Sequence, residues 1–293
     1  MILRLRHATA YAYEQPVSLA AHLLHLRPRS LPWQRVRDFA LAASPAPSRQ
    51  RDGVDHFGNP VAWMFHDEPH AAFEIVAEAV VELLPRPLPP VTPPWEQVSD
   101  AVRNQAWAWR EAEFAFASGM APALVQAREY ARPSFPPGRP VAEAACCLAR
   151  RIGAEFGYEP GATTVATPLS RVFAQRAGVC QDFAHAMIAG LRGLGLPARY
   201  VSGYLLTRPP PGEARLRGAD QSHAWVGCWL GPGLGWLDLD PTNSQVAGLD
   251  YVCLGWGRDY GDVSPTRGVL LGGGVHTLRV SVDVEPAAVA AGA

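Results

Sequence analysis

One cysteine, one histidine and two aspartates occupy local settings that could support covalent chemistry on an acyl group. Cys180, His223, Asp238 and Asp240 lie, in chain order, in the segments GVCQDFAH (178–185), SHAW (222–225) and GWLDLDPTN (235–243). A thiol attacks carbon as the thiolate, which a nearby base or a helix amino terminus must favour. An imidazole can be that base, and a carboxylate can hold it in the required tautomer. These residue types therefore predict a nucleophile, a base and an orienting group.

Cys180 is the predicted nucleophile. Apolar residues recur at helical spacing through 180–194, which predicts a helix with Cys180 in its first turn, two residues after Gly178. The dipole and free N–H groups of such a turn favour a thiolate by a few tenths to about 1 kcal/mol. The same N–H groups can stabilise an oxyanion that develops on a bound acyl group. The alternative is a small buried cysteine of the core; the glycine, the helix start and the downstream partners favour the nucleophile.

His223 is the predicted base, because it begins an apolar strand pattern that could face the amino terminus of the helix. A surface loop histidine is the alternative. His185 is the competing imidazole, but it lies about 500° around the helix from Cys180, well off the same side. We therefore interpret His185 as structural.

Asp238 and Asp240 both qualify as the orienting carboxylate, since alternate residues of a strand point to the same face. We favour Asp240, because it ends the strand before Pro-Thr-Asn, where side chains emerge at a site edge. Asp238 could instead frame the site. Tyr158 could line the site, donate to the oxyanion or simply pack in the core, and Asp182 could be a first-turn carboxylate favoured by the helix dipole.

The composition limits the class of protein. The chain has 293 residues, of which 48% are hydrophobic, and its net charge is −1, so it can form one large or two ordinary domains and has no basic excess for nucleic acid. Five cysteines without a CxxC pair fit a reducing compartment. The first residues do not resemble a secretory signal, and no run approaches the length of a membrane span. We expect a cytoplasmic protein without membrane contact, cofactor or metal.

The chain divides into regions of different character. Period-two patterns predict a β-rich domain over 1–84, and prolines crowd the linker predicted over 85–99. Residues 100–286 are the predicted catalytic core, and 287–293 the predicted disordered tail. Within the core, patterns predict helices over 101–116, 121–131 and 141–151, and strands over 198–206, 224–230, 235–239 and 277–284.

Several segments resemble the transglutaminase-like superfamily, in particular its bacterial two-domain group. They are residues 6–13, 55–59, 178–205, 222–225, 235–243 and 257–268. The resemblance implies an α+β fold: a papain-like core in which a nucleophile helix packs on an antiparallel sheet, preceded by a β-rich N-terminal domain. It also implies Cys180, His223 and Asp240 as the catalytic residues. One departure is Gly227-Cys228, where relatives often place an acidic residue.

The expected reaction is acyl transfer through a thioester on Cys180, with a protein, peptide or small amide as substrate. Hydrolysis, as in a protease or amidase, is favoured over amine cross-linking, because nothing marks an amine site and water is always available. The alternative is a non-catalytic binding or assembly module on the same fold. A redox role for Cys180 is weaker still, since no resolving cysteine lies near it in sequence. The oligomeric state is left open.

Overall fold

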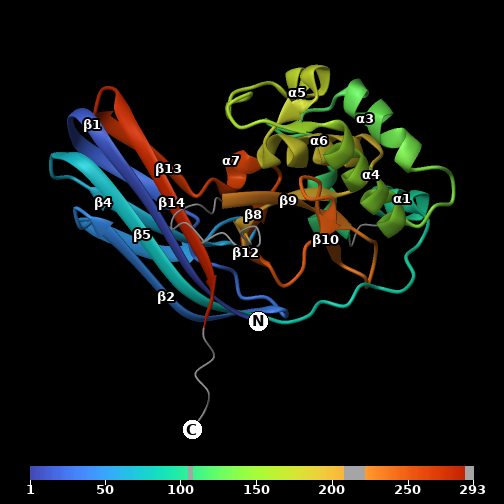
Figure 1. Cartoon of the computed structure of the whole chain (residues 1–293), viewed down its shortest axis with the longest axis horizontal. Helices are drawn as coiled ribbons and strands as arrows, with labels where there is room; N and C mark the ends of the chain where they lie inside the picture. Colours follow the sequence, from blue (N-terminus) through green and yellow to red (C-terminus); the bar gives the residue numbers. More distant parts are fainter. Residues whose placement is uncertain (105–107, 208–221, 288–293) are drawn as a thin grey trace, which may run out of the picture.

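The structure, a computed structural model, describes residues 1–104, 108–207 and 222–287 as two antiparallel sheets, the second covered by helices (Figure 1). The first sheet contains β1 (Ile2–Leu24), β2 (Gln34–Ser44), β3 (Arg49–Val54), β4 (Pro60–His66), β5 (His70–Leu83), β13 (Thr266–Gly272) and β14 (His276–Pro286). The second contains β8 (Ala198–Leu205), β9 (Ser222–Trp229), β10 (Trp236–Asp240), β11 (Gln245–Val246) and β12 (Tyr251–Gly257). A short parallel pair joins β6 (Gly157–Tyr158) to β7 (Ala177–Gly178). The helices are α1 (Trp95–Asn104), α2 (Trp109–Ala112), η2 (Glu113–Ala115), α3 (Val125–Ala131), η3 (Arg132–Ser134), α4 (Val141–Glu155), α5 (Leu169–Gln175), α6 (Cys180–Gly193) and α7 (Tyr260–Val263).

The first sheet is organised around β1, which is long enough to serve two groups of strands. Its first half pairs with β5 on one side and β14 on the other, and its second half pairs with β4 and β13. Apolar side chains alternate inward along β1 and β5, as period-two patterns require. The β-rich N-terminal region predicted from the sequence is confirmed.

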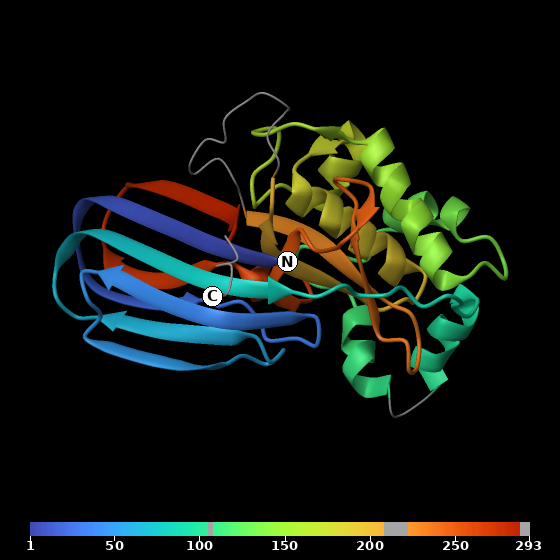
Figure 2. The same cartoon turned by 60° about the horizontal axis from the view of Figure 1, so that its bottom comes forward.

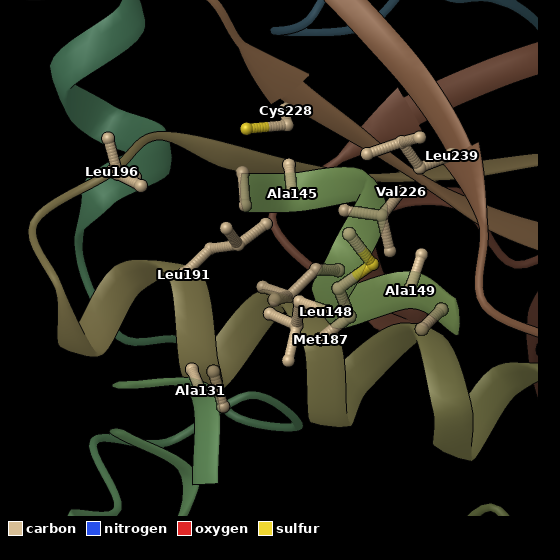
Figure 3. Close-up of a cluster of buried hydrophobic side chains, with 14 of the residues drawn as sticks. Ala131, Ala145, Leu148, Ala149, Met187, Leu191, Leu196, Val226, Cys228 and Leu239 are labelled. Atoms are coloured by element: carbon tan, nitrogen blue, oxygen red, sulfur yellow. The ribbon is translucent and has the colours of Figure 1, made fainter. Parts of the chain in front are cut away.

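The second sheet, in the order β11-β10-β9-β8-β12, carries α6 against β8 and β9. Helices α3, α4 and α5 contact α6 in turn. Figure 3 shows the core between them, where Leu148, Met187 and Leu191 face Val226 and Leu239 of the sheet. Helix α6 is therefore buried on all sides, between the sheet and the other helices, and the α+β core with a helix on an antiparallel sheet is confirmed.

The two sheets share a buried apolar cluster, in which Leu3 and Val81 of the first sheet meet Val252 of the second. Hydrogen bonds also join the two sheets. His7 Nδ1 lies 2.8 Å from the Tyr204 hydroxyl, and the Gln34 side chain bonds the backbone N–H and C=O of Cys253 at 2.8 and 2.7 Å. The first sheet thus packs on β8 and β12, the edge of the second sheet remote from β10.

The last two strands belong to the first sheet, whereas the sequence predicts them in the catalytic core. Residues 266–286 were expected in the core, but β13 and β14 return to pair with β1 (Figure 2). Alternation in 277–284 predicts a strand correctly, but it does not reveal which edge that strand joins. The segment 85–99 is partly helical, since α1 begins at Trp95. Of the helix expected over 101–116, the first residues belong to α1 and the last to α2 and η2, whereas 105–107 lie outside the described residues. Of the predicted tail, 288–293 lie outside the described residues.

Candidate active site

Cys180 is the first residue of α6, and its neighbours explain why the helix begins there. Val179 has an extended backbone, and its N–H donates to Asp182 Oδ2 over 2.9 Å, so the Asp182 carboxylate caps the helix. The Thr163 hydroxyl donates to the same oxygen over 2.6 Å. A Cβ at Gly178 would lie 2.6 Å from that oxygen, so glycine is required for the carboxylate to reach the cap. Asp182 thus has a structural role at the start of α6.

His223 lies on β9 between the other two candidate residues. Its Nε2 is 2.7 Å from Asp240 Oδ2, and the Cys180 side chain is close enough to act on the pKa of the ring. Burial alone would lower the imidazole pKa, but the hydrogen bonds and charges of Asp240 and Cys180 outweigh it and raise the pKa of His223 to about 9. Because Nε2 faces Asp240, Nδ1 is the nitrogen left for the thiol. The arrangement can hold a proton on the imidazole beside the sulfur.

Asp240 is completely buried and accepts five hydrogen bonds. Oδ2 accepts from His223 Nε2, Asn243 Nδ2 and the Tyr251 hydroxyl, at 2.7, 2.6 and 2.7 Å. Oδ1 accepts from the backbone N–H groups of Thr242 and Asn243, at 2.8 and 3.1 Å. Burial would raise the pKa of Asp240, but these donors and the His223 charge hold it below the ordinary value. The turn after β10 therefore keeps a buried carboxylate ionised.

Asp238, the alternative carboxylate, faces a different set of partners. Arg86 Nη1 lies 2.8 Å from its Oδ2, and Arg199 Nη2 lies 3.7 Å from its Oδ1. The Arg199 guanidinium stacks over the Trp256 ring at 3.8 Å. The structure thus places Cys180, His223 and Asp240 together and Asp238 in a separate arginine cluster.

Gly227, the departure noted in the sequence, lies opposite Asp238 in the sheet. A Cβ at Gly227 would lie 2.7 Å from Arg199 Nε and 3.1 Å from Asp238 Oδ1. Any side chain at 227 would therefore displace this pair. In this chain the acidic group beside Arg199 comes from β10 rather than from position 227.

His185 is buried in the core, where its ring lies 5.0 Å from that of Tyr200 and its Nε2 accepts the Tyr260 N–H. Burial lowers the pKa of His185 to about 4, so the ring is neutral. Tyr158 is half-exposed, and β6 pairs it with Gly178 just before Cys180. Burial, followed by the Cys180 charge, raises the pKa of Tyr158.

Sequence reasoning missed Asn243 and Tyr251. Asn243 had a local signal, because an Asp followed by Pro-Thr-Asn is typical of a turn in which the carboxylate accepts backbone N–H groups. Tyr251 had none, since it reaches Asp240 from the start of another strand.

A cavity of about 410 Å³ lies beside the first turns of α6. Gln181 borders it next to Cys180, and its apolar lining comes from the loops before α3 and α5 and from the start of α5. The apolar residues are Met120, Pro122, Leu124, Val165, Ala166, Pro168 and Leu169. Within 1–104, 108–207 and 222–287, no three His, Cys, Asp or Glu side chains are arranged to hold a metal ion. In the same part of the chain, no helix has the length and apolar character needed to cross a membrane.

Comparison with protein families identifies the class. The transglutaminase-like superfamily matches residues 128–241, and the bacterial transglutaminase-like N-terminal region matches residues 3–82. The chain belongs to the transglutaminase-like superfamily, with the N-terminal region of its bacterial members.

Some relatives match nearly the whole chain, and others match only part of it. The uncharacterized protein Rv2569c of Mycobacterium tuberculosis is 39% identical over 292 residues, covering 97% of this chain and 92% of that protein. Protein-glutamine gamma-glutamyltransferase of Pseudomonas aeruginosa is 40% identical over 100 residues, which are 31% of this chain and 15% of that protein. Among solved structures, a proposed cysteine protease from Cytophaga hutchinsonii has a TM-score of 0.75 and 21% identity, covering 97% of this chain and 90% of that chain. This last likeness shows the fold.

Proposed function

We propose that this protein is a cysteine-dependent acyl-transfer enzyme that acts on an amide of a protein, a peptide or a small molecule. The observation that carries the proposal is the position of His223, which hydrogen-bonds Asp240 through Nε2 and lies close enough to Cys180 for the thiol to raise the imidazole pKa. A merely structural histidine gains nothing from this placement, whereas a proton carrier between a thiol and a leaving amine requires it.

In the proposed first step, the Cys180 sulfur forms a bond to the amide carbon, and the carbonyl oxygen becomes an oxyanion near the amino terminus of α6. The C–N bond then breaks, and the His223 imidazolium gives its proton to the departing amine. The acyl group is left on Cys180 as a thioester. Asp240 keeps the imidazole oriented and does not itself take up the proton.

In the second step, water attacks the thioester while His223 takes its proton, and the acid leaves as the sulfur is released. We favour water over an amine acceptor, because water is always available and no feature of the site within the described part of the chain marks an amine pocket. The partial similarity to a protein-glutamine gamma-glutamyltransferase makes transfer to an amine the second outcome to test.

The test combines a thiol probe with a search for turnover. Limited iodoacetamide, followed by peptide mapping, should modify Cys180 at least about tenfold faster than half-buried Cys146. A library of peptide and small-molecule amides, with and without an added primary amine, should then give product and a thioester adduct on Cys180. The Cys180→Ala variant should give neither, and the Cys146→Ala variant, as the matched control, should give both. The chain has no lysine, so self-cross-linking through lysine cannot obscure the amine arm. Equal labelling of Cys180 and Cys146, with no turnover of any amide, would refute the proposal and leave a binding module.

A further inference from the structure

Tyr251 contacts the candidate active site, and no local sequence pattern predicts this contact. It begins β12 and is 6% exposed, and its hydroxyl donates to Asp240 Oδ2 over 2.7 Å. Its ring lies 6.1 Å from that of His223 and 5.3 Å, edge-on, from that of Trp225. Tyr251 therefore contacts the Asp240 carboxylate and the rings of His223 and Trp225.

The direction of this hydrogen bond is set by a further residue. Gln245 Nε2 donates to the Tyr251 hydroxyl oxygen over 2.7 Å. Because that oxygen already accepts a hydrogen bond from Gln245, its own hydrogen is free to point at the ionised Asp240. The result is a chain of donors running from Gln245 through Tyr251 to Asp240.

His223 and Tyr251 share the same acceptor atom. Both donate to Asp240 Oδ2, each over 2.7 Å. Each donor to a carboxylate oxygen reduces the negative charge that a second donor senses, and in a buried site this effect is larger than in water. A stronger hydrogen bond from Tyr251 to Asp240 therefore weakens the hydrogen bond between Asp240 and the protonated His223 ring.

We infer that Tyr251, directed by Gln245, is a positioning residue that limits how tightly Asp240 holds the imidazolium proton of His223. The inference rests on the proposed function, in which His223 must release this proton to the leaving amine. Without the tyrosine hydroxyl, the imidazolium is stabilised more strongly, and the proton leaves it less readily. Tyr251 thereby tunes proton transfer without touching substrate.

The test uses the full chain with Tyr251→Phe, which removes the hydroxyl and keeps the ring. Tyr204→Phe is the matched control, since Tyr204 is equally buried in the second sheet and its hydroxyl bonds His7 instead. An NMR titration of the histidine ring protons follows His223, which is identified among the nine histidines by the His223→Gln spectrum. We expect Tyr251→Phe to move the His223 titration midpoint upward by about half a pH unit, and Tyr204→Phe to leave it unchanged.

Kinetics provide the second readout. With an amide substrate, Tyr251→Phe should lower kcat by about 3- to 30-fold with little change in KM, because it affects proton transfer rather than binding. If Tyr251→Phe does not fold, Gln245→Ala, at an exposed position, should give a smaller upward shift of the midpoint. An unchanged or lowered His223 midpoint, or the same shift in Tyr204→Phe, would overturn the inference. The titration needs no substrate, so absence of turnover in the wild type would count against the proposed function and not against the role of Tyr251.

Discussion

Arg86 and Asp238 form an ion pair that fastens the proline-rich segment to the second sheet, with Arg86 Nη1 2.8 Å from Asp238 Oδ2. The Arg86 guanidinium also stacks over the Trp33 ring at 4.0 Å and donates to the Trp236 carbonyl. This pair gives Asp238 a role of its own next to the candidate active site.

Arg86→Ala should lower the free energy of unfolding by about 1 to 3 kcal/mol, because it leaves a largely buried carboxylate with only the longer contact to Arg199. Urea denaturation measures the loss. Arg37→Ala is the control, since its ion pair with Glu82 is exposed and should cost at most about 1 kcal/mol. Equal losses of unfolding free energy in the two variants would show that the Arg86–Asp238 pair stabilises the fold no more than an exposed ion pair does.

Asp240→Asn and Asp238→Asn distinguish the two carboxylates of β10. With an amide substrate, Asp240→Asn should reduce kcat about 10²- to 10⁴-fold, because the amide no longer stabilises the His223 imidazolium. Asp238→Asn should reduce kcat less than about tenfold in folded protein, as Asp238 contacts arginines rather than His223. The measurement is steady-state kinetics on samples matched by circular dichroism. The reverse order of the two losses would assign the orienting role to Asp238.

The raised pKa of His223 predicts that both stability and turnover fall at alkaline pH. The folded protein holds this proton up to about pH 9, above the ordinary histidine value of 6.5. Its contribution to stability is therefore complete below pH 6.5 and is lost as the pH rises through about 9. Turnover should fall over the same range, because the proton donor for the leaving amine disappears. A pH–rate profile tests this, and a midpoint already near 6.5 would contradict the ion-pair geometry.

A histidine cluster in the first sheet predicts sensitivity to acid. His22, His66 and His70 are at most 9% exposed, and among the described residues His22 Nδ1, His66 Nδ1 and His70 Nε2 have no hydrogen-bond partner. Burial, followed by the nearby His66 and His70, lowers the pKa of His22 to about 4. The stability that depends on neutral His22 is complete above pH 6.5 and is lost as the pH falls toward 4, by about 1 to 2 kcal/mol.

Replacement of His22 tests this expectation. His22 stacks on Phe73 at 4.2 Å, so His22→Phe keeps an aromatic ring in place and removes the titrating group. Thermal unfolding between pH 7 and pH 4 (assay conditions) should depend less on pH in this variant than in wild type. His56→Phe, at an exposed histidine, is the control and should leave the pH dependence as it is. If thermal unfolding of His22→Phe depends on pH as strongly as that of wild type, groups other than His22 cause the acid sensitivity.

Gly178→Ala should disturb the start of α6. The new Cβ would lie 2.6 Å from Asp182 Oδ2, so the carboxylate would move and release the Val179 N–H. We expect a loss of about 1 to 3 kcal/mol in unfolding free energy and slower iodoacetamide modification of Cys180. Gly248→Ala is the matched control, because no atom lies within 4 Å of its added Cβ. Normal labelling in Gly178→Ala would mean that the Asp182 cap does not position the thiol.

The sequence by itself determined the local parts of the candidate site. Helical spacing placed the start of a helix at Cys180, and the turn signal after Asp240 placed that aspartate at the end of a strand, because both depend on residues a few positions apart. Only the tertiary structure decided which carboxylate faces His223, that Tyr251 completes the shell of Asp240, and that β13 and β14 return to the first sheet. These outcomes depend on strand register and on packing between residues distant in sequence. Periodicity marks the faces of a strand, but long-range packing determines which partners those faces meet.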